Sequence, residues 1–400
     1  MSSRYEMIPS GGITLAKGFL AGAVHAGTKT VHELDVAILY SEAPCAAAGV
    51  FTVNQIKSAP VIMSQKHLAG RRAQAIVANS GCANACVGEQ GSADALEMAG
   101  LAAAKLGIPP EDVLVASTGV IGVPLPMDRV RVGIKEIELS REGGHDFARA
   151  IMTTDTRPKE IATQVGAGDF IIGGAAKGAG MIHPDLATML CFITTDASVD
   201  ASFLQSSLVK AVEISLNMIS VDGDTSPSDC VFLLANGLAG NEMISFGNGD
   251  AFQEALSAVC VHLAKSIARD AEGATKLIEV AVEGAKEQVQ ARLAARTIAS
   301  SPLVKAAMHG NDPNWGRIVA ALGRSGAQLV AERLDVYLNN ICVMKGGCRT
   351  PFNKKELRTA LAKANDVLIR VCLNLGNGKA TAWGCDLSEE YVRINSEYTT

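Results

Sequence analysis

The alternation of apolar and polar positions predicts strands in several parts of the chain. Between Ile278 and Glu283, branched apolar residues alternate with glutamate or alanine, which is the pattern of a strand with one face on a core. Shorter runs rich in β-branched residues have the same character. Together these runs predict strands at 36–40, 75–78, 113–117, 187–195 and 276–282.

Longer segments carry apolar residues at a spacing of three to four, which predicts helices. One helix is also indicated by its ends, because Asp312 suits the N-cap, Pro313 the first helical position and Gly323 the exit. Strands and helices mix throughout, so we predict an α/β (α+β) protein of layered mixed sheets flanked by helices, with a smaller C-terminal α/β domain at about 285–400. The other predicted helices span 92–106, 202–218, 251–270, 286–300 and 353–365.

The composition is that of a large globular protein. A chain of 400 residues that is 48% hydrophobic and 19% charged can bury an extensive core. The net charge of -5 and the absence of a lysine/arginine cluster argue against binding to nucleic acid. The sequence has no apolar run of about 18 residues and begins without a signal-peptide core, so we expect no membrane association and a cytoplasmic location.

Metal and cofactor chemistry find little support in the sequence. The ten cysteines lie mostly in apolar runs, which indicates reduced core residues, and even the closest pair, Cys82 and Cys86, lacks the spacing of a zinc site. The acidic segment at 222–229 begins like a calcium loop, but Pro227 and Leu233 occupy positions where glycine and glutamate are needed. We therefore expect neither a metal nor a cofactor.

One unusual stretch is KGAGMIHPDLATML at 177–190, in which a glycine- and proline-rich turn leads into an apolar strand. Signatures of serine hydrolases, phosphate loops and dinucleotide sites are absent from the sequence. Threonine needs a base to act as a nucleophile, and cleavage between Ala187 and Thr188 would free an α-amino group with an ordinary pKa of about 7.7–8.0. Glycine-rich turns before buried strands are also common without any cleavage.

The same stretch resembles the self-cleavage motif of the glutamate N-acetyltransferase family, the ornithine acetyltransferases of arginine biosynthesis, whose chains are cut between alanine and threonine. The resemblance covers nearly the whole chain, with further motifs in the order of the family. These motifs are DVAILYSEAPCAAAGVFTVNQIKSAPV, ANSGCANAC, STGVIG, IMTTDTRPK, SVDGDTSPSD, DAEGATK, NDPNWGRI and YVRINSEYTT.

The resemblance implies a cut at Ala187–Thr188 into an α chain, 1–187, and a β chain, 188–400, assembled as a heterotetramer of two of each. It implies transfer of an acetyl group from N2-acetyl-L-ornithine to L-glutamate in two half-reactions, with the acetyl group carried on Thr188. The sequence leaves open whether acetyl-CoA is also a co-substrate. No nucleic-acid or membrane partner is expected.

The resemblance also assigns site residues. Thr188 would be the nucleophile and, through its own α-amine, the base, while Thr118 and Gly119 would stabilise the oxyanion. Lys177 would also lower the pKa of that amine by like-charge repulsion, and His183 is expected to be a structural donor. Of the first two threonines in TTDT, Thr154 is preferred over Thr153. The predicted substrate-binding residues are Thr154, Lys177, Thr188, Glu272, Asn395 and Thr400.

Two other functions compete with this interpretation. An autoprocessed amidase or aminopeptidase would use the same nucleophile with water as the acceptor, so its rate would not depend on glutamate. A binding or structural protein would remain one intact chain near 42 kDa. Acceptor dependence and denaturing electrophoresis separate the three.

Overall fold

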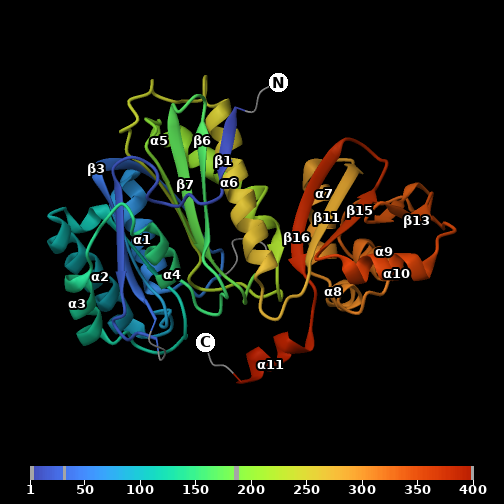
Figure 1. The fold of residues 1–400 in the computed structure, drawn as a ribbon, viewed down its shortest axis with the longest axis horizontal. Coiled ribbons are helices and arrows are strands. Elements are labelled where there is room, and N and C mark those ends of the chain that lie inside the picture. The colour runs from blue at the N-terminus through green and yellow to red at the C-terminus, as the bar shows by residue number, and fades with distance from the viewer. Residues whose placement is uncertain (1–3, 30–32, 184–188, 398–400) are drawn as a thin grey trace.

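Two mixed β-sheets with helices on their faces form the protein in the computed structural model, which describes residues 4–29, 33–183 and 189–397 (Figure 1). The predicted layered α/β class is confirmed. The first sheet has nine strands within the described residues, in the order β1-β6-β7-β8-β10-β3-β4-β5, with β2 paired to β3. Its strands are β1 Tyr5–Ile8, β2 Phe19–Val24, β3 Val36–Phe51, β4 Arg72–Asn79, β5 Val113–Ser117, β6 Lys159–Val165, β7 Phe170–Lys177, β8 Leu190–Thr195 and β10 Cys230–Ala235.

The centre of this sheet combines the two halves of the sequence. Strands β8 and β10 follow residue 188, yet they lie between β7 and β3, which precede it. Strand β8 runs antiparallel to β7 and parallel to β10, so Leu190 pairs with Lys177 on one side and with Cys230 on the other. A cut at 187–188 would therefore leave both fragments joined within one sheet.

Strand β8 is buried on both faces, as its continuous apolar sequence predicts. Cys191 and Ile193 belong to the core beneath α5 and α6, whereas Leu190 and Phe192 belong to the core of the opposite face. The helices of this part are α1 Ala59–His67, α2 Gly88–Leu106, α3 Met127–Glu136, α4 Gly144–Ala150, α5 Ala201–Glu213 and α6 Asp250–Arg269, with short 3-10 turns η1 Leu68–Gly70, η2 Pro110–Asp112 and η3 Leu216–Met218.

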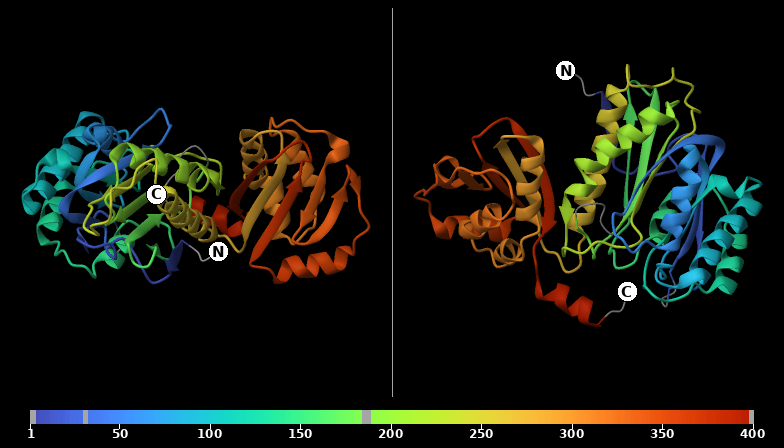
Figure 2. Two further views of the ribbon diagram at one scale, coloured as in Figure 1. Left: turned by 90° about the horizontal axis from the view of Figure 1, so that it is seen from above. Right: turned by 180° about the vertical axis from the view of Figure 1, so that it is seen from behind.

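The second sheet has seven strands within the described residues, in the order β14-β13-β12-β15-β11-β16-β9. Alternate residues of β11 are buried, as its sequence pattern predicts. Helix α6 packs on β6 and β7 and also contacts β16, so it lies between the sheets (Figure 2). The elements are β9 Ile219–Ser220, β11 Leu277–Ala285, β12 Asp335–Leu338, β13 Ile341–Lys345, β14 Cys348–Arg349, β15 Asp366–Cys372, β16 Gly378–Cys385, α7 Gln288–Ala299, α8 Pro302–His309, α9 Trp315–Gly323, η4 Ala331–Arg333, α10 Lys354–Lys363 and α11 Glu389–Glu397.

Some local predictions are wrong. Helix α9 begins at Trp315 rather than after Asp312, because the Asp312 amide bonds back to Ala307 O and its carboxylate accepts from Asn314 Nδ2 at 3.1 Å. The helix predicted at 202–218 ends at Glu213, and a 3-10 turn completes the segment.

All cysteines are unpaired and most are buried, but Cys86 and Cys348 are exposed. Among the described helices, none combines the length and the apolar character needed to span a bilayer.

Candidate active site

A pocket lies where β5 and β7 end, and it gathers the predicted site residues that the structure describes. The first two threonines of TTDT both line it, so the pocket does not distinguish Thr154 from Thr153. Ala187, Thr188 and Thr400 lie outside the described residues. The predicted residues in the pocket wall are Thr118, Gly119, Thr154, Lys177, Glu272 and Asn395.

Hydrogen bonds fix the chain that leaves β5. The Ser117 hydroxyl donates to Asn79 Oδ1 at 2.6 Å, and the Thr118 amide donates to the Asn79 carbonyl at 3.1 Å. Asn79, Ser117 and Thr118 are all buried, and hydrogen bonds in a buried environment strongly restrict the orientation of the chain that makes them. Thr118 therefore enters the pocket from a rigid strand end.

Gly119 occupies a position that only glycine fits. Its φ is +127°, and an added Cβ would lie 2.3 Å from the carbonyl carbon of Gly81. No acceptor among the described residues takes the Gly119 amide hydrogen. A fixed and unused N–H at a pocket wall is the donor that an oxyanion requires.

Lys177 is the last residue of β7, and it is only 3% exposed. Its Nζ donates to Thr118 Oγ1 at 3.2 Å. Burial lowers the pKa of the Lys177 ammonium, although the charges of Asp155, Asp229 and Glu272 act against this. This lysine is thus a poorly hydrated cation beside the predicted oxyanion donors.

A buried network of charges holds the segment that bears Thr154. Lys159 Nζ donates to Asp155 Oδ1 and to Asp270 Oδ2, both at 2.6 Å. Asp155 also accepts from the Gly178 amide at 2.7 Å and from the Thr153 amide at 3.0 Å. Burial raises the pKa of Asp155, but Lys159, Lys177 and the Gly178 amide outweigh it and hold the pKa at about 2. The network ties the TTDT loop to the end of β7.

Glu272 and Asn395 form the part of the pocket wall that comes from the C-terminal part of the sequence. Asn395, on α11, donates from Nδ2 to Glu272 Oε2 at 2.7 Å. The Glu272 amide bonds to Ala179 O at 3.0 Å, and its carboxylate lies against Gly180, where any Cβ would clash with it. A carboxylate that is 8% exposed suits recognition of an ammonium group.

Sequence comparison identifies the family of the chain. The model of the ArgJ family matches residues 20–400. The chain belongs to the ArgJ family. Similar proteins include the arginine biosynthesis bifunctional proteins ArgJ of Dehalococcoides mccartyi, 56% identical over all of both chains, and of Symbiobacterium thermophilum, 53% identical over 98% of this chain and 99% of the relative.

A solved structure of the ArgJ protein from Bacillus halodurans is 46% identical, with a TM-score of 0.51, and covers 52% of this chain and 98% of its own. The family predicted from the sequence motifs is thus confirmed, and with it the assignment of this chain as an acyltransferase of arginine biosynthesis. Membership in the ArgJ family favours the transferase over the amidase alternative.

Sequence reasoning missed several residues of the pocket wall in this ArgJ family member. Ser226 and Ser228 belong to the acidic segment 222–229, and neither the calcium-loop comparison nor the family resemblance gives these serines a role. Both motif segments, ANSGCANAC and SVDGDTSPSD, were available as signals, because each supplies lining residues. The residues of the pocket wall outside the predicted site are Ala83, Ile121, Thr153, Gly180, Met181, Ser226 and Ser228.

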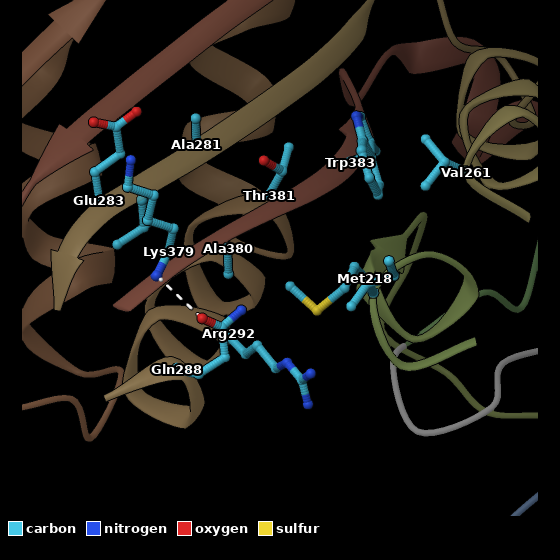
Figure 3. Close-up of a pocket in the computed structure, with 12 residues that line it drawn as sticks. Met218, Val261, Ala281, Glu283, Gln288, Arg292, Lys379, Ala380, Thr381 and Trp383 are labelled. Carbon is cyan, nitrogen blue, oxygen red and sulfur yellow. Dashed lines mark hydrogen bonds between the residues drawn. The ribbon is translucent and has the colours of Figure 1, made fainter. Parts of the chain in front are cut away.

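A second hollow lies between η3, α6 and the sheet formed by β11 and β16 (Figure 3). Met218, Val261 and Trp383 give it a largely apolar wall. Arg292 at its edge pairs with Glu213 at 3.1 Å, and the Lys379 amide donates to Gln288 Oε1 at 3.3 Å. None of the predicted site residues that the structure describes lines this hollow, so the chemistry is assigned to the first pocket.

The described residues contain no group of three or more histidine, cysteine, aspartate or glutamate side chains arranged to hold a metal ion. His183 Nδ1 lies 3.3 Å from Ser220 Oγ, at the strand β9 of the second sheet. This contact agrees with a structural role for His183. That His183 takes no part in catalysis stays a prediction.

Proposed function

We propose that this ArgJ family member transfers the acetyl group of N2-acetyl-L-ornithine to L-glutamate through a covalent acetyl-threonine at Thr188. The observation that carries the proposal is the register of β7 and β8. Leu190, two residues after Thr188, pairs with Lys177, and Lys177 donates to Thr118 beside the unused Gly119 amide. The strand that follows residue 188 therefore begins next to Lys177, whose side chain contacts the proposed oxyanion donor Thr118.

Thr188 becomes a nucleophile when the bond to Ala187 is cut. As its Oγ attacks the acetyl carbon, the hydroxyl proton passes to the free α-amine, and the same proton then goes to the departing ornithine nitrogen as the C–N bond breaks. In the second half-reaction the glutamate amine attacks the acetyl ester, and Thr188 recovers its hydroxyl proton. No proton is gained or lost over the cycle.

A negative charge develops on the acetyl oxygen in each half-reaction. We assign the stabilisation of this charge to Thr118 and Gly119. Among the described residues no group accepts the Gly119 amide hydrogen, and the close approach to Gly81 restricts the position of this amide. Lys177 supplies positive charge next to Thr118 Oγ1, which strengthens the hydroxyl as a donor. Removal of one donor of this kind typically costs about 10² to 10³ in rate.

Substrate recognition is assigned to the polar wall of the pocket. Glu272 would bind an ammonium group, and Asn395 holds its carboxylate in place. Lys177 and Thr154 would bind a carboxylate, since both line the same pocket as Glu272. Opposite charges on two walls fit acetylornithine and glutamate, which are amino acids with charged ends. Thr400 stays in the proposal as a substrate-binding residue on the family resemblance alone.

The topology supports cleavage without separation of the fragments. Strands β8 and β10 of the proposed β chain lie between β7 and β3 of the proposed α chain. The solved ArgJ chain from Bacillus halodurans is about half as long as this chain, and the segment from Thr188 to Thr400 is also slightly over half. We extend the proposal to a cytoplasmic heterotetramer of two α and two β chains, which light scattering of the purified protein would test.

Glutamate dependence tests the function. Ornithine release from acetylornithine should require glutamate after the first turnover, and equal rates with and without glutamate would instead indicate an amidase. The curated relatives are named bifunctional, so acetyl-CoA is proposed as a second acetyl donor. Release of free thiol from acetyl-CoA in the presence of glutamate, and its absence in Thr188→Ala, would establish that second activity.

A further inference from the structure

Asp229 is a buried carboxylate with one oxygen unused. The residue is 1% exposed and immediately precedes β10. Its Oδ1 accepts the Met189 amide hydrogen at 2.9 Å. Its Oδ2 has no hydrogen-bond partner among the described residues. Buried polar atoms nearly always have partners, and an unsatisfied one destabilises the folded protein, so this oxygen needs an explanation.

The position of Asp229 relates it to the proposed nucleophile. Met189 N is bonded covalently to the carbonyl carbon of Thr188. The same Met189 amide donates its hydrogen bond to Asp229 Oδ1. The neighbours Ser226 and Ser228 line the active-site pocket. Asp229 thus anchors the chain one residue after Thr188, at the edge of the site.

We propose that Asp229 is a positioning residue for the catalytic amine: one oxygen fixes the Met189 amide, and the other receives the α-amino group that cleavage creates at Thr188. The inference rests on the proposed function. A nucleophile, a base and a third group that orients the base form the common arrangement of such sites. Here Thr188 would supply the first two and Asp229 the third.

The charge on Asp229 is consistent with this role. Burial raises the pKa of the Asp229 carboxyl well above its ordinary value, and the Met189 amide, the Lys177 charge and the nearby Ser226 backbone amide oppose this only in part. An ammonium group at hydrogen-bond distance would favour the ionised carboxylate. During transfer the proton moves between the Thr188 hydroxyl, the amine and the leaving group, while Asp229 neither gains nor loses one. The titratable groups around Asp229 are Lys177 and Cys230 and, beyond Lys177, Asp155, Lys159 and Glu272.

Asp229→Asn tests the inference, since the amide oxygen of asparagine can still accept from Met189 but the neutral side chain cannot stabilise an ammonium. We expect normal chain cleavage, a kcat about 10- to 100-fold lower, and an acidic limb of the pH–rate profile about one unit lower, because the amine loses a neighbouring negative charge. A role in folding alone would not move that limb. If Asp229→Asn does not fold, Asp229→Ser, whose hydroxyl can also accept from Met189, carries the same prediction.

Asp94→Asn is the matched control. Asp94 is also 1% exposed, with one oxygen bonded to Gln90 Nε2 at 2.7 Å and the other without a partner among the described residues. It lies in α2, outside the pocket, so its variant should keep the wild-type profile. If Asp229→Asn is cleaved and keeps the wild-type kcat and the wild-type acidic limb, the inference about Asp229 is overturned but the proposed function is not. A folded Asp229→Asn protein that remains uncut would also overturn the inference. An uncut, inactive wild-type protein would instead remove the proposed function.

Discussion

Lys177 Nζ donates a hydrogen bond to Thr118 Oγ1 at 3.2 Å and so connects the end of β7 to the residue that follows β5. These strands belong to different parts of the first sheet, with β8, β10, β3 and β4 between them in its order. The contact therefore closes the pocket across the sheet end. It also brings a buried cation to the hydroxyl that we assign to the oxyanion.

Thr118→Val should lower kcat by about 10² to 10³, because it removes one oxyanion donor and leaves the Lys177 ammonium without its acceptor. Steady-state kinetics with both substrates would measure the change. Thr359→Val is the control, since Thr359 is exposed on α10 and its hydroxyl bonds only to Lys355 O, at 2.9 Å, among the described residues. A Thr118→Val enzyme with wild-type kcat would remove Thr118 from the oxyanion site.

Gly119→Ala should abolish transfer and also destabilise the protein. The new Cβ would lie 2.3 Å from Gly81 C at a φ that side chains rarely adopt, so the loop after β5 must shift. Gly100→Ala makes the same change within α2, where the Cβ meets nothing within 4 Å, and should stabilise by about 0.5–1 kcal/mol. Thermal melts and activity would be compared. An active, fully stable Gly119→Ala protein contradicts the close approach.

Glu272→Gln should raise KM for acetylornithine at least about tenfold, with a smaller effect on kcat, because a neutral amide cannot pair with an ammonium group. Glu356→Gln is closely matched: Glu356 accepts from Asn353 Nδ2 at 2.7 Å, just as Glu272 accepts from Asn395 Nδ2. It lies on exposed α10 and should leave KM unchanged. Equal KM values in all three proteins would show that Glu272 does not read the substrate.

Lys159→Met should destabilise the protein by about 3–5 kcal/mol at pH 7, since it leaves Asp155 and Asp270 buried without their cation. Lys265→Met, which breaks the more exposed pair with Glu279, should cost less than about 1 kcal/mol. Urea unfolding in a Thr188→Ala background keeps the chain in one piece. Equal losses in the two variants would show that the buried network contributes no more than a surface pair.

The same network gives a pH dependence. The pKa of Asp155 is held at about 2, below its ordinary value of about 3.9, so its contribution is complete above pH 4 and lost as the pH falls toward 2. The gap between wild type and Lys159→Met should therefore narrow over that range. A gap that stays constant would argue against ionised Asp155 as its source.

Local patterns predicted much of the fold. Strand β5 was predicted with its observed bounds, because a short apolar run between polar turns has few other conformations available. The N-cap at Asp312 failed because residues 310–314 follow α8 in a turn whose hydrogen bonds involve Ala307 O. Tertiary context outweighed a reasonable capping pattern there.

The site was predictable in part. Thr118, Gly119, Lys177, Glu272 and Asn395 were named from motifs, and the structure brings them together, although their roles stay predictions. Ser226 and Ser228 lie in the motif SVDGDTSPSD, but the motif alone does not show that they line the pocket. They reach the pocket because β10 pairs with β8, a long-range register that no local pattern contains.

Acetylation of Thr188 is the central claim, and mass spectrometry of the purified protein tests it most directly. The protein would be analysed before and after brief exposure to N2-acetyl-L-ornithine without glutamate, with Thr188→Ala as the control. We predict two fragments, with a new N-terminus at Thr188 that gains one acetyl group on exposure and loses it when glutamate is added, and a single unmodified chain for the control. An intact wild-type chain, or an acetyl group on another residue that glutamate removes, would contradict the account.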